Sequence, residues 1–182
     1  MKSEVSVCSE LDSNDCLLRN LDVGNQTFIC TADLDFEGGI KYVTKIKAVN
    51  LVGVSTEVFS DGFVLDSTPP LMGEVFFAET SKSTIEGVTK YYARSVISAQ
   101  WRGFWDKESD VHTSYVCLGT TSGECNTRNF TMVQNSTAYT FADLPFLQGE
   151  TYFVSVKVEN GAGLNSDIQT SEGILFDQTG KY

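Results

Sequence analysis

The sequence predicts an all-β protein made of tandem two-sheet sandwiches. Apolar and polar residues alternate with a period of two over 41–48 and 151–159, which is the pattern of half-buried strands. Glycine, asparagine, serine and aspartate gather between the strand candidates, as they do in turns. No stretch shows the i, i+3, i+4 spacing of a helix. The chain also repeats itself after about 110 residues, so we expect the same sandwich to recur.

This internal repeat sets the domain organisation. The matched pairs include Cys8 with Cys117, Cys16 with Cys125, Leu34 with Leu144, Tyr42 with Tyr152, and Asp66 with Asp177. The offset grows from 109 to 111 along the chain, so two single-residue insertions separate the copies. We expect a partial module at 1–66, a complete module at 67–177, and the start of a linker to a further module at 178–182. The first module is expected to lack its opening strands, because nothing in it matches residues 69–110.

Seven short strands are expected in the second module. The alternation of Tyr152, Val154, Val156 and Val158 with polar neighbours marks the clearest one. The others are expected at 73–80, 95–101, 112–120, 127–134, 137–141 and 171–177. Seven short strands in about 110 residues indicate a two-sheet sandwich. We expect Trp101 to lie in its core against Leu144 and Tyr152, joining the two sheets, with Leu34 and Tyr42 as the matching core residues of the first module.

The segment 144–166 resembles the region around strands E, F and G of a fibronectin type III domain, and 34–55 has the same shape. Trp101, at the end of the candidate strand 95–101, matches the core tryptophan of strand B in that family. The resemblance covers essentially the whole chain and implies tandem Ig-like or fibronectin type III-like β-sandwiches. It implies a structural or adhesive array, but it supplies no binding site, because this fold supports many functions.

Charge and composition exclude several function classes. The chain has 13 basic and 24 acidic side chains, a formal net charge of −11, and no basic stripe. This argues against a nucleic acid or an anionic membrane surface as partner, and no apolar run is long enough to insert into a membrane. The single histidine, His112, leaves little for a catalytic triad or a histidine-rich zinc site. We therefore expect a non-enzymatic protein.

The five cysteines favour an oxidising compartment. Cys8 with Cys16 and Cys117 with Cys125 form two C-x7-C pairs, and the simple interpretation is two local disulfides. Each disulfide would stabilise its module by about 2–3 kcal/mol. The alternative is that these cysteines are reduced and buried. Cys30 is left over and is expected to be unpaired or bonded to another chain.

Three N-x-Ser/Thr sequons lie at Asn25, Asn129 and Asn135. Together with the paired cysteines they predict a secreted or cell-surface glycoprotein that carries N-glycans. The N-terminal residues lack the apolar region of a signal peptide. We therefore expect the sequence to be part of a longer extracellular chain.

An acidic set is the candidate metal site. Asp106, Glu108 and Asp110 alternate after Trp101, and Asp66 stands at the module junction. Calcium prefers several hard oxygen ligands, which clustered carboxylates supply. The spacing lacks the glycine and terminal glutamate of a calcium loop, so a solvated acidic loop is the competing interpretation and no cofactor is expected.

The expected function is structural or adhesive: spacing, assembly or protein–protein contact. The partners would be other modules of the same parent chain, neighbouring copies, or other proteins. The alternative is a receptor ectodomain that binds a carbohydrate or calcium. A module without its opening strands would also expose an apolar sheet face. One hypothesis is that a neighbouring chain or a separately cleaved upstream segment supplies the missing strands, with Cys30 bonded to it. The alternative is that the sequence simply begins at a cut.

Overall fold

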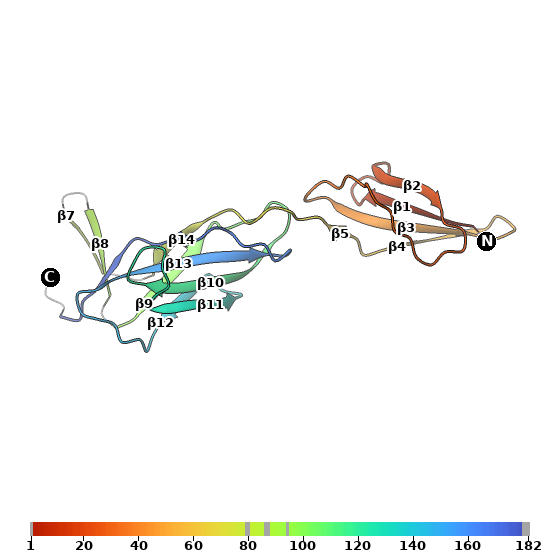
Figure 1. Ribbon diagram of the computed structural model, residues 1–182. Coiled ribbons are helices and arrows are strands. Elements are labelled where there is room, and N and C mark those ends of the chain that lie inside the picture. The colour runs from red at the N-terminus through yellow and green to blue at the C-terminus, as the bar shows by residue number, and fades with distance from the viewer. Residues whose placement is uncertain (1, 79–80, 86–87, 94, 180–182) are drawn as a thin grey trace. The chain divides into compact units, whose positions relative to one another are not determined.

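A computed structural model describes residues 2–78, 81–85, 88–93 and 95–179, and every regular element among them is a β-strand (Figure 1). The all-β prediction is therefore confirmed. The chain divides into two compact units, Met1–Ser67 and Thr68–Tyr182.

The first unit contains a single antiparallel sheet. Its strands are β1 (Lys2–Ser9), β2 (Cys16–Asp22), β3 (Lys41–Val49), β4 (Ser55–Phe59) and β5 (Phe63–Val64). The sheet order is β2-β1-β3-β4, and β5 also pairs with β3. Residues 23–40, which connect β2 to β3, contain no strand. The alternating sequence 41–48 thus becomes β3, at the centre of the sheet.

The second unit is a two-sheet sandwich. The smaller sheet has the order β12-β9-β6, and the larger one has the order β11-β10-β13-β15-β8-β7, with β14 pairing with β13. The strands are β6 (Glu74–Phe77), β7 (Ser81–Ile85), β8 (Val88–Ala93), β9 (Ile97–Arg102), β10 (Val111–Gly119), β11 (Arg128–Gln134), β12 (Ala138–Phe141), β13 (Thr151–Asn160), β14 (Gln169–Thr170) and β15 (Ile174–Phe176). Figure 1 shows both layers.

The predicted strands of the second unit correspond to β6, β9, β10, β11, β12, β13 and β15, with ends shifted by a few residues. Residues 79 and 80 of the predicted strand 73–80 lie outside the described residues. The hairpin of β7 and β8 was not predicted, and β8 pairs in parallel with β15. Its two strands hold several polar residues and lack one apolar face, so periodicity gave no signal there.

The core of the second unit lies between its sheets. Trp101 and Tyr152 are buried in this apolar cluster, and Leu144 packs against it from the loop after β12. The indole Nε1 of Trp101 donates a hydrogen bond of 3.0 Å to Ser114 Oγ, which satisfies its polar atom inside the core. Val156, on β13, has no exposed surface.

Both units contain the same tyrosine corner. The hydroxyl of Tyr42 accepts a hydrogen bond from the backbone N–H of Glu37, and that of Tyr152 accepts one from Leu147, each at 3.0 Å. Both tyrosines are buried. These bonds fix the chain where it enters β3 in the first unit and β13 in the second. Leu34 of the first unit is half-buried.

Candidate functional sites

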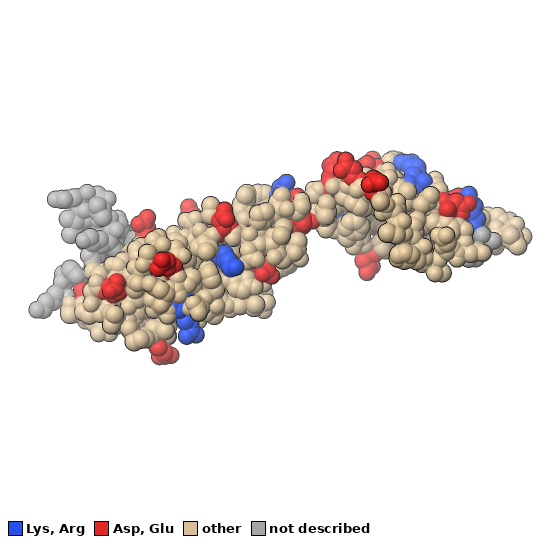
Figure 2. All heavy atoms as spheres, in the orientation of Figure 1, with Lys and Arg blue, Asp and Glu red and all other residues tan. Residues whose placement is uncertain are grey.

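Acidic side chains outnumber basic ones on the surface, and the face drawn in Figure 2 has no basic patch. Figure 2 shows acidic side chains on both units, scattered among uncharged residues and accompanied by fewer Lys and Arg. Among the described residues, no helix is both long and apolar enough to cross a membrane.

Asp106 organises the loop between β9 and β10. Its Oδ1 accepts hydrogen bonds from the backbone N–H groups of Glu108 (2.8 Å) and Ser109 (3.0 Å), and its Oδ2 accepts one from Asn160 Nδ2 (3.1 Å). Desolvation by itself raises the pKa of Asp106. The three hydrogen bonds outweigh that effect and lower the pKa below its ordinary value, because they favour the charged form.

Glu108 connects this loop to the beginning of the second unit. Its side chain is only 3% exposed, and its Oε2 accepts hydrogen bonds from the backbone N–H (3.0 Å) and the hydroxyl (2.6 Å) of Thr68. Lys107 Nζ lies 3.5 Å from its other oxygen. Asn160 Nδ2 also donates to the carbonyl oxygen of Thr68 at 3.1 Å. Protein donors therefore hold both Asp106 and Glu108, and the loop acts as a clamp on the entering chain.

The remaining acidic candidates lie in different settings. Asp110 is exposed just before β10. Asp66 is half-buried and belongs to the first unit. A calcium site at Asp66, Asp106, Glu108 and Asp110 stays a prediction, since the hydrogen bonds of Asp106 and Glu108 give these carboxylates a structural role without a metal.

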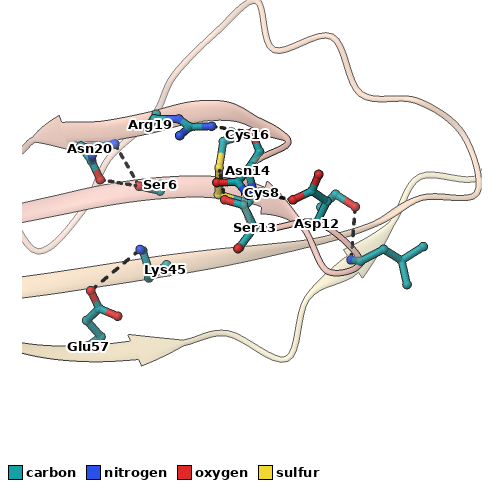
Figure 3. Close-up of a disulfide and its surroundings, with 12 residues drawn as sticks. Ser6, Cys8, Asp12, Ser13, Asn14, Cys16, Arg19, Asn20, Lys45 and Glu57 are labelled. Carbon is teal, nitrogen blue, oxygen red and sulfur yellow. Dashed lines mark hydrogen bonds and ion pairs between the residues drawn. A yellow bond between two sulfur atoms is a disulfide. The ribbon is translucent and has the colours of Figure 1, made fainter.

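Each unit has one disulfide in the structure. Cys8–Cys16 links β1 to β2, beside a hydrogen bond of 3.2 Å between Ser6 Oγ and Asn20 Oδ1 (Figure 3). Cys117–Cys125 links β10 to the loop before β11. These are the two pairings predicted from the repeated C-x7-C spacing. Cys30 is an exposed free thiol.

The three sequon asparagines are all exposed. Asn25 lies in the turn after β2, Asn129 in β11, and Asn135 in the turn between β11 and β12. Asn135 has a positive φ of 56°, a conformation that asparagine tolerates better than most residues. All three side chains are therefore accessible to a glycosylating enzyme.

A cavity of about 580 Å³ opens beside β9, β10 and β11. Apolar side chains such as Trp101, Phe104 and Val133 line it together with Arg102 and His112. No carboxylate or thiol is among its lining residues, and His112 is exposed. Sequence reasoning did not find this cavity, because its lining comes from separate strands.

Many solved structures are similar to this chain, among them the following three. The chicken CNTN1 FN1-FN3 domains match 97% of it at 14% identity with a TM-score of 0.42. Domains of titin match 96% at 17% identity with a TM-score of 0.52, and the fibronectin(III)-like modules of Clostridium thermocellum CbhA match 98% at 11% identity with a TM-score of 0.39.

The chain spans 57% of the CNTN1 structure, 55% of the titin structure and 80% of the CbhA structure. No protein-family model and no curated protein matches the sequence. At these identities the likeness concerns the fold alone, and the titin match carries it. The chain has a fibronectin type III-like fold.

Proposed function

We propose that this chain is a structural or adhesive part of an extracellular array of fibronectin type III-like modules, which provides spacing, assembly and protein–protein contact. The observation that carries the proposal is the matched disulfide: Cys8–Cys16 and Cys117–Cys125 occur at corresponding hairpins of the two units. Structural disulfides persist in oxidising compartments, where small modules use them for stability. The three exposed sequons support the same compartment.

Secretion from mammalian cells with an added signal peptide tests the compartment. We expect a product with two intact disulfides, one free thiol at Cys30, and glycans at Asn25, Asn129 and Asn135, measured by intact mass before and after enzymatic deglycosylation. Secreted protein without glycans, or with all five cysteines reduced, would contradict the extracellular assignment.

Contact between modules is tested separately. Beads coated with the secreted chain should aggregate with one another or bind to cells, whereas beads coated with a reduced and alkylated preparation should not. If coated beads neither aggregate nor bind to cells, the adhesive part of the proposal is wrong and a spacer role remains.

No cofactor is part of this proposal. Because protein donors already occupy the carboxylates of Asp106 and Glu108, we expect the same melting temperature in millimolar calcium and in EDTA. A higher melting temperature in calcium that disappears in an Asp106→Asn variant would instead establish a calcium site.

A further inference from the structure

One face of the first-unit sheet is apolar and only partly covered. Val5 and Tyr42 on this face are 4% and 2% exposed, and the ring of Phe36 packs on Tyr42 and Phe63 with centroids 5.0 and 5.2 Å apart, but other large apolar side chains of the face stay exposed. Ile46 on β3 lies opposite Val5 on β1 and opposite Val58 on β4, and Val5 lies opposite Leu21 on β2. Residues opposite each other in antiparallel strands share a face, so these four side chains form one row. Phe63 shares this face beside Tyr42. We name Leu21, Ile46, Val58 and Phe63 the open face, because they are 39%, 41%, 56% and 46% exposed.

The second unit shows what this face looks like when it is covered. The repeat matches Ile46 with Val156 and Phe63 with Ile174. The sheets agree with this match, since Tyr42 pairs with Phe63 as Tyr152 pairs with Ile174. Val156 and Ile174 have no exposed surface, because they belong to the core closed by the smaller sheet. The equivalent positions of the first unit thus carry apolar, core-type residues, but no second sheet covers them.

The first-unit segment that matches β12 also forms no strand pairing. Residues 136–144 contain β12, which pairs with β9 through four residues and a 2.9 Å contact between Thr140 Oγ1 and Ser98 Oγ. The matching residues 26–34 of the first unit form no strand. A strand is held by its hydrogen-bond ladder to a neighbouring strand, and residues 2–67 include no counterpart of β9 that could provide this ladder.

We propose that the open face binds a two-stranded β segment with the alternation of β6 and β9, and that this segment is joined to the chain ahead of Lys2. In the second unit, the covering side chains come from alternate positions: Val75 and Phe77 on β6, and Ile97, Ala99 and Trp101 on β9. The occupant is therefore an antiparallel strand pair with an apolar residue at every second position. It would bury the open face and form a ladder with residues 26–34.

Topology favours a covalently joined segment over a separate partner. In the second unit only residues 103–110 separate β9 from β10. β10 and β1 occupy the same place, next to the central strand and to the disulfide-linked neighbour. A short connection ahead of β1 therefore brings a covering strand directly over the open face. This proposal does not depend on the extracellular function, because an uncovered apolar face needs a partner in any compartment.

The sheet register defines a direct experiment. Lys2 lies opposite Val49, and Thr113 lies opposite Glu159, the residue that the repeat matches with Val49. A second copy of residues 69–112 should therefore be fused to the N-terminal side of Lys2, replacing Met1, in the full chain. We expect hydrogen exchange of 41–59 to slow about tenfold or more, and binding of the dye ANS to fall. The matched control is the same graft with Ile97→Asp and Trp101→Asp in the added copy, which should restore fast exchange and dye binding.

Three results would overturn the proposal. Equal exchange of 41–59 in the graft and in its control would show that no strand pair of this kind binds the face. In the unmodified chain, exchange as slow over 41–59 as over 151–160 would show that residues 23–40 already close it. Protection that rises with protein concentration, together with a dimer in sedimentation, would identify a second copy as the occupant. The last two measurements need no graft, so they decide the matter even if the graft does not fold.

Discussion

The two units arrange corresponding strands in the same order but bury them to different extents. The order β2-β1-β3-β4 of the first unit corresponds to β11-β10-β13-β14 of the second. Each unit has one disulfide on its β1 or β10 strand and one buried tyrosine corner. Yet Ile46 and Phe63 are about half exposed, whereas their matches Val156 and Ile174 are fully buried.

This difference separates two contributions to the fold. Alternation, turns and the tyrosine corner act within one sheet, so the first unit forms them without a second layer. Burial of the apolar face needs the opposite sheet, which only the second unit has among the described residues. Most hydrophobic stabilisation comes from this burial, so the first unit should be the less stable of the two.

The largest expected effect comes from matched truncations on the two apolar faces. Ile174→Ala should lower the free energy of unfolding of the second unit by about 2–5 kcal/mol, because it leaves a cavity in a packed core. Phe63→Ala should lower the free energy of unfolding of the first unit by only about 1 kcal/mol, since Phe63 is already half exposed. Urea titration read by hydrogen exchange separates the units. Equal losses would mean that both faces are packed, which would contradict the comparison.

The disulfides should contribute equally in both units. Replacing Cys8 and Cys16 together by serine should cost about 2–3 kcal/mol, and so should replacing Cys117 and Cys125, because the two loops have the same sequence separation of 8. The measurement is thermal unfolding without reductant, with Cys30→Ser as the control that removes a thiol without a bond. A pair whose removal leaves its unit unchanged would not be a structural disulfide.

The tyrosine corners give a smaller, matched effect. Tyr42→Phe and Tyr152→Phe each remove one hydrogen bond from a backbone N–H, so each should cost about 0.5–1.5 kcal/mol in its own unit. The two costs should agree, because each corner is made within one sheet and its preceding loop. A loss of stability in the second unit alone would show that the corner depends on the second sheet. It would then contradict the statement that the corner is formed within one sheet.

Much of this architecture was predictable from the sequence. Alternation located β3 and β13, the C-x7-C spacing predicted both disulfide pairs, and the resemblance pointed to Trp101 as a core residue. The hairpin β7–β8 was missed because its strands lack a consistent apolar face. Pairing register was also beyond reach: Val7 lies opposite Thr44, but its sequence match Val116 lies opposite Val156, not Val154. A shift of two residues keeps each side chain on its face, so it leaves no trace in the alternation.

The candidate site was less predictable. Clustered carboxylates suggested calcium, but the sequence could not show that Thr68 and Asn160 would reach Glu108 and Asp106, because these residues are far apart in the chain. Hydrogen bonds over such separations depend on the finished sandwich.

The smallest expected effect concerns the Asp106 hydrogen bonds and how the stability of the second unit depends on pH. The pKa of Asp106 is lowered in the folded protein, so its contribution to stability is complete above the unfolded-state pKa of about 3.9 and is lost as the pH falls through the lower folded value. Asp106→Asn should therefore lower the free energy of unfolding of the second unit by about 1 kcal/mol or less at pH 7. It should also make the difference in unfolding free energy between pH 7 and pH 3 smaller. Urea midpoints of the second unit at both pH values measure this, with the exposed Asp110→Asn as the matched control. If both variants retain the full pH dependence, the hydrogen bonds of Asp106 do not stabilise the folded state, and the loop is a solvated acidic loop without a clamp.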